Sequence, residues 1–211
     1  MSLIVQKYGG TSVADLDRIR NVAGRVARIY EAGNDIVVVL SAMAGVTDKI
    51  IAMAHQASPN PPKRELDVLL ATGEQTTAAL LTMVLNSMNL PAQSLLGFQA
   101  RVLTDHTYGN ARIHEIDATR IQQLLSERKI VVVAGFQGCD SNGNITTLGR
   151  GGSDTTAVAI SAAIKADSCE IYTDVDGVYT ADPSICTTAR KLPRITYDEM
   201  MEMASLGAKV L

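Results

Sequence analysis

The sequence lacks the residues and patterns that mark several common classes of protein. Of its 211 residues only 4% are aromatic, and the formal net charge of -3 leaves no electrostatic footprint for nucleic acid. Three cysteines at wide spacing (Cys139, Cys169 and Cys186) indicate neither a disulfide framework nor a zinc site. No apolar run approaches the ~18 residues of a membrane helix, and residues 2–6 lack the basic start of a signal peptide. These absences favour a reduced, soluble, cytoplasmic chain without a membrane or nucleic-acid partner.

Several catalytic signatures are absent as well. No Gly-x-x-x-x-Gly-Lys-[Ser/Thr] sequence occurs, which excludes a P-loop nucleotide site. No Gly-x-Gly-x-x-Gly follows the first apolar run, which argues against a dinucleotide enzyme. The three histidines (His55, His106 and His114) have no ligand-like spacing, and no Ser–His–Asp or Cys–His arrangement can be argued. Any chemistry must therefore come from other polar clusters.

What the chain does contain is an alternation of short apolar runs and longer amphipathic segments. Short apolar runs, three of them rich in Val and Ile, predict strands at residues 3–5, 36–40, 130–136 and 170–173. Helical spacing predicts helices at residues 18–31, 48–56, 66–88, 157–164 and 197–211, and a further one through Ile116, Ile121, Leu124 and Leu125. Residues 91–112 read only as an irregular strand-and-loop region. Continuous apolar strands separated by helices favour an α/β fold with a parallel sheet covered on both faces.

The whole chain, residues 1–211, is expected to form one layered domain. The proline-rich stretch at residues 59–62 is short enough to be a loop rather than a linker. The sequence stops at Lys209-Val210-Leu211, an apolar pair without a cap or polar tail. We therefore expect the C-terminal end of the domain to be incomplete.

The first polar cluster, Lys7-Tyr8-Gly9-Gly10-Thr11-Ser12, directly follows the first predicted strand. Glycines let backbone N–H groups approach phosphate oxygens, and the lysine supplies a mobile positive charge. The cluster is therefore a plausible anion cradle. A tight turn whose lysine faces solvent is the alternative.

The second cluster, Gly149-Arg150-Gly151-Gly152-Ser153-Asp154-Thr155-Thr156, precedes a compact predicted helix. Ser153 or Asp154 can cap that helix, and the glycines expose N–H groups at its positive end. Arg150 adds a fork suited to a carboxylate or phosphate. An ordinary glycine turn with an N-cap would not require the arginine, so we favour a binding role.

The third cluster, Thr173-Asp174-Val175-Asp176-Gly177-Val178-Tyr179-Thr180-Ala181-Asp182-Pro183, follows the last predicted strand. Carboxylates at strand ends lie where an open α/β sheet places its ligands. Its aspartates could help to hold a magnesium nucleotide. A solvated hairpin turning at Asp176-Gly177 is the alternative.

Two smaller features complete the candidate site. Ser41-Ala42-Met43-Ala44-Gly45-Val46-Thr47 follows the second predicted strand and could form a polar pocket at the same sheet edge. Glu74 is a charge inside a largely apolar helical stretch. Without further information it is an exposed helix glutamate; if buried it needs a partner, for which a ligand ammonium group is a candidate.

Taken together, these residues resemble the aspartokinase family. Lys-Tyr-Gly-Gly-Thr-Ser at residues 7–12, Gly-Arg-Gly-Gly-Ser-Asp at 149–154 and the third cluster carry the resemblance, which runs in order through the whole chain. Gly-Asn-Ala-Arg at 109–112 and Val-Val-Ala-Gly-Phe-Gln-Gly at 132–138 extend it. The third cluster alone identifies only the amino-acid-kinase superfamily. The first cluster and the Glu74 segment are the parts that point to aspartokinase.

The resemblance implies a three-layer αβα sandwich with an open, mostly parallel sheet. It also implies transfer of the γ-phosphoryl group of MgATP to the side-chain carboxylate of L-aspartate, giving 4-phospho-L-aspartate on the route to lysine, threonine and methionine. Mg²⁺ would arrive with ATP, without a dedicated metal site on the protein. Members of the family continue into regulatory ACT domains, which are not present in these residues, and the full-length protein is expected to be a homo- or hetero-oligomer.

The resemblance also implies roles for individual residues. Lys7 and Asp154 would be catalytic, with Lys7 on the transferring phosphoryl group and Asp154 organising Lys7 and the magnesium. The aspartate would contact Ser41, Thr47, Glu74, Arg150, Gly151, Gly152 and Ser153, with Glu74 on its ammonium and Arg150 on its α-carboxylate. The nucleotide would contact Lys7, Tyr8, Gly9, Gly10, Thr173, Asp174, Tyr179, Thr180, Asp182, Pro183 and Lys209.

Two alternatives remain at this stage. One is another kinase of the same fold, of the uridylate kinase or glutamate 5-kinase type; a uridylate kinase would need a nucleobase pocket in place of Glu74 and Arg150. The other is a catalytically incomplete fragment that folds and binds nucleotide. Activity with a panel of acceptor substrates distinguishes the first alternative from aspartokinase. The second alternative predicts nucleotide binding without catalytic turnover.

Overall fold

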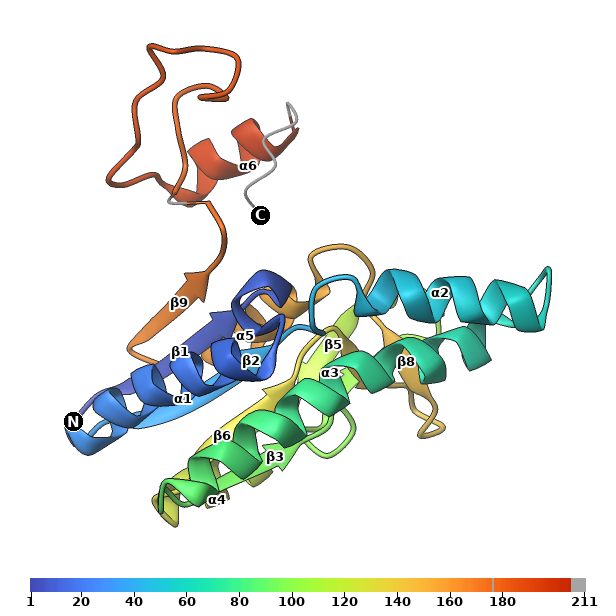
Figure 1. Cartoon of the computed structure of the whole chain (residues 1–211), viewed down its shortest axis with the longest axis horizontal. Coiled ribbons are helices and arrows are strands. Elements are labelled where there is room, and N and C mark those ends of the chain that lie inside the picture. The colour runs from blue at the N-terminus through green and yellow to red at the C-terminus, as the bar shows by residue number, and fades with distance from the viewer. Residues whose placement is uncertain (176, 206–211) are drawn as a thin grey trace. The chain divides into compact units, whose positions relative to one another are not determined.

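The computed structural model describes residues 1–175 and 177–205, and the chain forms two compact units, residues 1–172 and 173–211. The first unit is built on a five-stranded sheet in the order β3-β6-β2-β1-β9 (Figure 1). All of its neighbouring strands pair in parallel. The strands are β1 (Leu3–Tyr8), β2 (Asp35–Leu40), β3 (Ala92–Leu95), β6 (Ile130–Ala134) and β9 (Ser168–Tyr172). The predicted parallel sheet is confirmed.

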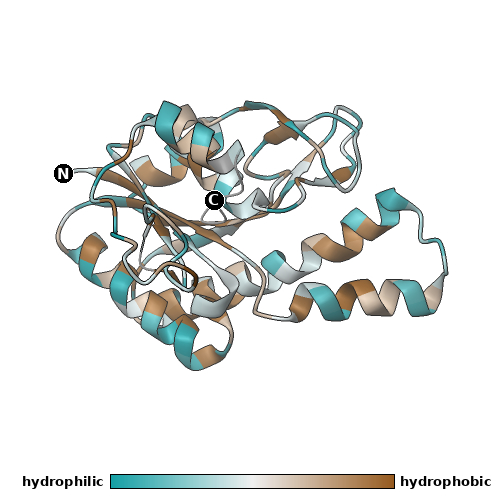
Figure 2. Cartoon of the chain, turned by 90° about the horizontal axis from the view of Figure 1, so that it is seen from above, coloured by the Kyte–Doolittle hydropathy of each residue, from teal (hydrophilic) through white to brown (hydrophobic). Residues whose placement is uncertain are grey.

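Both faces of this sheet are buried, because successive side chains along the central strands point to opposite faces and enter different cores. In β2, Ile36, Val38 and Leu40 enter one core, whereas Val37 and Val39 enter the other. Helices α1 (Leu16–Glu31) and α3 (Lys63–Ser87) cover the first face, and α4 (Thr119–Ser126) and α5 (Gly152–Ile164) cover the second. Figure 2 shows the hydrophobic strands between these helices. The first unit is therefore a three-layer αβα sandwich, as the resemblance implied.

A second, smaller sheet extends the first unit in the order β5-β4-β7-β8. It consists of β4 (Val102–Thr104), β5 (Ile113–Ile116), β7 (Gln137–Cys139) and β8 (Ile145–Thr147). β7 and β8 form an antiparallel hairpin, and β4 lies parallel to β7 and antiparallel to β5. The hairpin leads directly into the segment that carries Arg150. The predicted irregular region at residues 91–112 contains β3 and β4.

By length and composition alone, helix α3 is long and apolar enough to cross a membrane. Its residues Ala78, Leu81 and Leu85 are buried in the core that it shares with α1 and the sheet. It also buries Asp67 and Glu74, which a lipid-facing helix would not carry without partners. We therefore interpret α3 as a core helix. It follows α2 (Val46–Ala57) after the proline-rich turn.

Three sequence predictions were wrong in detail. The strand predicted at residues 130–136 ends at Ala134, because Phe136 adopts a positive φ of 68° that no strand residue has. Ile116 ends β5 instead of beginning a helix, and α4 starts only at Thr119. Neither Ser153 nor Asp154 caps α5: the helix begins at Gly152 after Gly151, whose φ of 73° favours glycine.

The second unit has little regular structure among its described residues. Its helix α6 spans Tyr197–Ser205, within the helix predicted at residues 197–211, of which residues 206–211 lie outside the described part. Tyr179 forms a bridge with Lys191, and the Thr180 amide donates to the Arg190 carbonyl at 2.9 Å. Asp176, predicted to turn with Gly177, also lies outside the described residues.

Burial on α3 predicts where the first unit is sensitive to truncation. Leu81 is fully buried in the core, whereas Met83 on the same helix is 66% exposed. We expect Leu81→Ala to lower the free energy of unfolding by about 2–5 kcal/mol, because it leaves a cavity. Met83→Ala, the control, should change it by less than about 0.5 kcal/mol. Urea unfolding followed by circular dichroism measures both, and equal effects would contradict the assignment of this core.

Candidate active site

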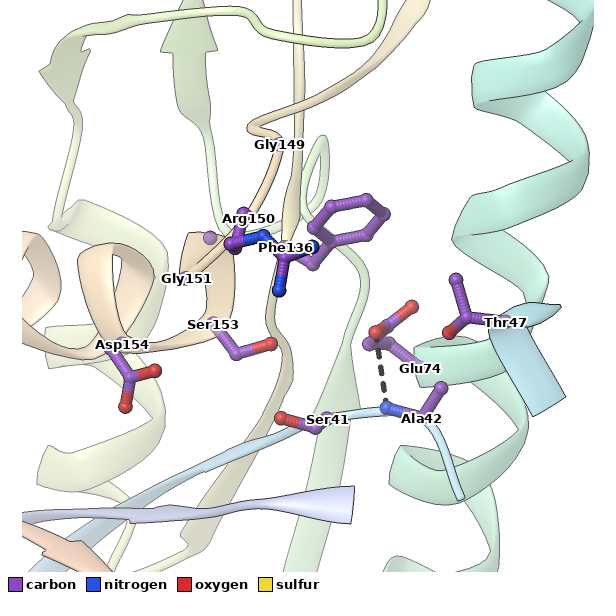
Figure 3. A pocket seen from close by; sticks show the side chains of 11 residues that line it. Ser41, Ala42, Thr47, Glu74, Phe136, Gly149, Arg150, Gly151, Ser153 and Asp154 are labelled. Atoms are coloured by element: carbon purple, nitrogen blue, oxygen red, sulfur yellow. Dashed lines mark hydrogen bonds between the residues drawn. The ribbon is translucent and has the colours of Figure 1, made fainter. Parts of the chain in front are cut away.

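One pocket of about 250 Å³ opens at the carboxyl ends of the central strands. Its walls come from the segment after β2, the start of α2, the segment after β6, helix α3 and the entrance to α5 (Figure 3). Ligand pockets for drug-sized molecules measure ~300–1,000 Å³, so this one suits a smaller ligand. It is lined by Ser41, Ala42, Thr47, Glu74, Phe136, Gly149, Arg150, Gly151, Gly152, Ser153 and Asp154.

An ion pair joins the first strand to the entrance of α5. Lys7 Nζ lies 2.8 Å from Asp154 Oδ1, and the Lys7 side chain is only 8% exposed. Asp154 Oδ1 makes no hydrogen bond within the described residues, so the contact is a charge pair without hydrogen-bond geometry. Lys7 ends up buried because β1 is a central strand, between β2 and β9. A buried cation next to a pocket-lining carboxylate is suited to meet a ligand anion.

Glycines let α5 approach the strand ends closely. A Cβ on Gly135, which follows β6, would lie 2.9 Å from the Leu40 carbonyl and 3.0 Å from Ser153 Cβ. Gly151 supplies the left-handed turn before the helix. The positive end of α5 therefore faces the pocket with its first-turn amides, an arrangement that favours a bound anion.

Arg150 lies between two glycines in the left-handed conformation, Gly149 (φ 79°) and Gly151 (φ 73°). Its side chain is exposed, and among residues 1–175 and 177–205 no hydrogen bond or ion pair to its guanidinium is present. The side chain lines the pocket. It is thus a cation available to a ligand carboxylate or phosphate.

Glu74 supplies the opposite charge from α3. Its side chain is 5% exposed, and its Oε1 accepts a hydrogen bond from the Ala42 amide at 3.0 Å (Figure 3). Its Oε2 is buried without a hydrogen-bond partner in the described part of the chain. Burial raises the pKa of Glu74 to about 7, against the lowering effect of the Ala42 amide. A buried, unpartnered carboxylate oxygen in a pocket indicates a cationic ligand group.

The structure brings together the residues predicted to contact the smaller substrate. All seven line this one pocket: Ser41, Thr47, Glu74, Arg150, Gly151, Gly152 and Ser153. Glu74, for which an exposed position was the plainer expectation, is buried. The predicted catalytic residues Lys7 and Asp154 contact each other at the edge of the pocket.

Two residues of the first cluster, whose nucleotide contacts stay predictions, make contacts within the fold itself. The Tyr8 side chain is 2% exposed and stacks on Tyr172 at 4.7 Å between ring centroids, because alternation along β1 turns it into the core. The Gly9 amide donates to the Tyr172 carbonyl at 3.1 Å as part of the sheet edge. Gly10 therefore remains the candidate amide donor of the pair.

The other predicted nucleotide contacts lie in the second unit. They are Thr173, Asp174, Tyr179, Thr180, Asp182 and Pro183. Within that unit the Asp182 carboxylate caps its own turn, accepting the Ser184 amide at 2.9 Å. Lys209 lies outside the described residues. Their contacts with a nucleotide stay predictions.

Sequence reasoning missed three features of the pocket. Phe136 and Ala42 line it without having been assigned a role. Gly73 lets α3 approach the segment after β2, since a Cβ there would lie 2.8 Å from Ala42 Cβ. The glycine next to Glu74 was the available signal for this close contact.

Comparison with known proteins agrees with this geometry. A sequence model of the amino acid kinase family matches residues 2–211. An aspartokinase of Pseudomonas aeruginosa is 59% identical over 211 residues, which are all of this chain and 51% of that protein. The chain thus spans about half the length of the curated relatives it matches.

Two solved structures are similar over nearly the whole chain. An aspartate kinase from Synechocystis is 51% identical with a TM-score of 0.85, covering 100% of this chain and 34% of that one. Aspartokinase III of E. coli, solved in complex with aspartate and ADP, is 30% identical with a TM-score of 0.89, covering 99% of this chain and 57% of that one.

The raised pKa of Glu74 predicts a pH-dependent effect of Glu74→Gln on stability. The pKa is about 7 in the folded chain against an ordinary value of 4.5 for a glutamate, so between these values the folded state binds more protons and loses stability as the pH rises. Gln keeps an acceptor for the Ala42 amide but carries no charge. We expect its unfolding free energy relative to wild type to increase by about 2–3 kcal/mol between pH 5 and pH 8.

Chemical denaturation at several pH values measures this difference. Glu65→Gln, an exposed carboxylate at the start of the same helix, controls for the loss of one negative charge. A difference between Glu74→Gln and wild type that stays constant from pH 5 to pH 8 would show that Glu74 is not a desolvated carboxylate.

Proposed function

Because the chain belongs to the amino acid kinase family, we propose that it carries the catalytic site of an aspartate kinase. The side-chain carboxylate of L-aspartate attacks the γ-phosphorus of MgATP, and the bond to the bridging oxygen breaks. That electron pair stays on the β-phosphate, so the products are 4-phospho-L-aspartate and ADP. The similarity to proteins named aspartokinase and aspartate kinase supports this choice of substrate.

The observation that carries the proposal is the buried, unpartnered Oε2 of Glu74 in the same pocket as Arg150. An α-amino acid presents an ammonium and a carboxylate from one carbon. Glu74 and Arg150 offer the two complementary charges, and Ser41, Thr47 and Ser153 add hydroxyl groups to the walls of the same pocket (Figure 3). The pocket thus has the charge pattern of an amino-acid site.

The chemistry needs charge stabilisation more than it needs a base. The attacking carboxylate is ionised at neutral pH, but it must approach a polyanion. In this proposal Lys7 and the positive end of α5 stabilise the negative charge that accumulates on the transferring group. In this scheme Asp154 holds Lys7 in position through their 2.8 Å contact.

Magnesium enters as part of the substrate MgATP. Within residues 1–175 and 177–205 no group of three or more His, Cys, Asp or Glu side chains is arranged to hold a metal ion. Asp154, which lines the pocket and contacts Lys7, would contact the magnesium. The residues of the third cluster, together with Lys209, would bind the nucleotide.

The wider setting follows from the same proposal. The enzyme would act in the cytoplasm, at the first step from aspartate toward lysine, threonine and methionine. Residues 1–211 would belong to one catalytic domain, and the complete protein would act as an oligomer. The E. coli relative solved with aspartate and ADP binds the two small molecules that the proposal requires.

The alternatives predict different acceptors. A uridylate kinase would need a nucleobase site, whereas this pocket places a carboxylate and a guanidinium within about 250 Å³. A catalytically incomplete fragment would bind nucleotide without turnover. Release of ADP from MgATP by the purified chain, with and without L-aspartate, uridylate or glutamate, therefore tests the proposal directly.

Lys7→Ala tests the assigned chemistry. If Lys7 stabilises the transferring phosphoryl group, kcat should fall about 10²- to 10³-fold, while KM for aspartate changes less than about threefold. Lys49→Ala, which removes an exposed lysine from α2, is the matched control and should keep wild-type rates. A Lys7→Ala variant with normal kcat would exclude Lys7 from the reaction.

The pH dependence of aspartate binding tests the role of Glu74. Binding an ammonium requires the ionised carboxylate, so KM for aspartate should rise as the pH falls below about 7, approaching tenfold per unit. Glu74→Gln should raise KM roughly 10- to 100-fold at pH 8 and flatten this dependence. Steady-state rates from pH 6 to pH 9 measure both, with Glu65→Gln as control. A pH dependence that survives in Glu74→Gln would assign it to another group.

A further inference from the structure

A second buried carboxylate on α3 has no role in the chemistry proposed so far. Asp67 is fully buried, seven residues before Glu74 and therefore on the same side of the helix. Its Oδ2 accepts the amides of Thr147 (2.8 Å) and Gly109 (3.0 Å), and its Oδ1 accepts the Thr147 hydroxyl (2.8 Å). In the part of the chain that the structure describes, Asp67 forms no ion pair, so these three donors hold its charge.

The contacts of Asp67 lie at the base of the segment that carries Arg150. Thr147 is the last residue of β8, an edge strand whose amide there would have no ladder partner without Asp67. Residues 148–151, which we call the Arg150 loop, follow immediately. Asp67 therefore fixes the start of this loop to the helix that carries Glu74.

The same carboxylate also holds the surface against which the Arg150 loop packs. A Cβ on Gly149 would lie 2.7 Å from Asn110 Oδ1 and 3.4 Å from the Gly109 carbonyl. The Gly109 amide is one of the three donors to Asp67. The 109–110 turn and the Arg150 loop are thus both tied to one side chain.

The position of Arg150 depends on the loop that carries it, because its own side chain adds no polar contact. It stands between two glycines, and no polar contact to its guanidinium is present among residues 1–175 and 177–205. Its position relative to Glu74 is therefore determined by the loop and by what holds the loop. Glu74 and Arg150 are 76 positions apart in the sequence; Asp67 links their two elements through buried hydrogen bonds.

We propose that Asp67 is a positioning residue that sets the spacing between Glu74 and Arg150 and thereby the affinity for the amino-acid substrate. This inference rests on the proposed function, because it assigns Glu74 and Arg150 to the two charges of one ligand. Asp67 itself touches no substrate. Both groups hold the amino acid equally in the ground state and the transition state, so a loss of their spacing should appear in KM and not in kcat.

Three variants test the proposal by steady-state kinetics. Asp67→Ala should raise KM for aspartate about tenfold, with kcat and KM for ATP within about twofold of wild type. Asp67→Asn should stay within about threefold of wild type, because its amide can donate to the Thr147 hydroxyl while its oxygen accepts both backbone amides. Thr147→Val, which removes only the hydroxyl bond, should raise this KM about two- to threefold, and decides the question if Asp67→Ala does not fold.

Asp140→Ala is the matched control. Asp140 is a buried carboxylate at the tip of the same β7–β8 hairpin and accepts the amides of Asn142 and Asn144, each at 2.9 Å, and the Tyr108 hydroxyl at 3.1 Å. In the described part of the chain its side chain forms no hydrogen bond with residues 147–151. Its loss should lower the melting temperature but leave KM for aspartate unchanged. An unchanged KM in folded Asp67→Ala, or equal changes in Asp67→Ala and Asp140→Ala, would overturn the proposal.

Amide hydrogen exchange tests the positioning role of Asp67 without requiring catalytic activity, and therefore independently of the proposed function. Amide hydrogen exchange should become faster at residues 107–112 and 147–151 in Asp67→Ala and stay as in wild type elsewhere on α3. If wild type shows no turnover with aspartate, the proposed function fails while faster exchange confined to these segments still supports the positioning role. Unchanged exchange there would overturn the positioning role regardless of activity.

Discussion

The close approach of α5 to the ends of β2 and β6 is the constraint on which the site depends. Gly135 permits it, since any side chain there would collide with the Leu40 carbonyl and with Ser153. The approach places the Thr156 hydroxyl against the Phe136 amide at 3.1 Å, which holds Phe136 in its positive-φ conformation. It also brings Asp154 within 2.8 Å of Lys7. A parallel sheet alone would end its strands at one edge; the small residue brings the helix dipole there as well.

The charges at this edge come from different layers of the fold. Lys7 and Asp154 belong to β1 and α5, whereas Glu74 comes from α3, on the opposite face of the sheet. Arg150 comes from a loop of the smaller sheet. Lys7 and Asp154 pair with each other, whereas Glu74 and Arg150 are held by separate contacts and form no ion pair among residues 1–175 and 177–205. The unpartnered oxygen of Glu74 is the direct sign of this separation.

Sequence reasoning found the features that depend on local pattern. Residues close together in the sequence determine apolar strands, amphipathic helices and glycine clusters at strand ends. The sheet, α1 and the polar clusters could therefore be predicted. Glu74 could not be placed from periodicity, because its burial depends on how closely Gly73 lets α3 approach Ala42. The packing of Tyr8 could not be predicted from its motif, because the alternation of β1 turns its ring onto Tyr172. The β7–β8 hairpin was missed because its strands are three residues each.

The residues of the site fall into two sets that are carried by different elements, and this separation affects which residues can change independently. In the proposed function, the residues that recognise the amino acid are carried by α3 and the Arg150 loop, and Asp67 joins those two elements. The residues proposed to face the transferring group are carried by β1 and α5, joined by the Lys7–Asp154 pair. Substitutions in α3 or the Arg150 loop would alter how the acceptor substrate fits the pocket without moving Lys7. Within one fold, acceptor specificity and phosphoryl-transfer chemistry can therefore change separately, because separate contacts hold the residues responsible for each.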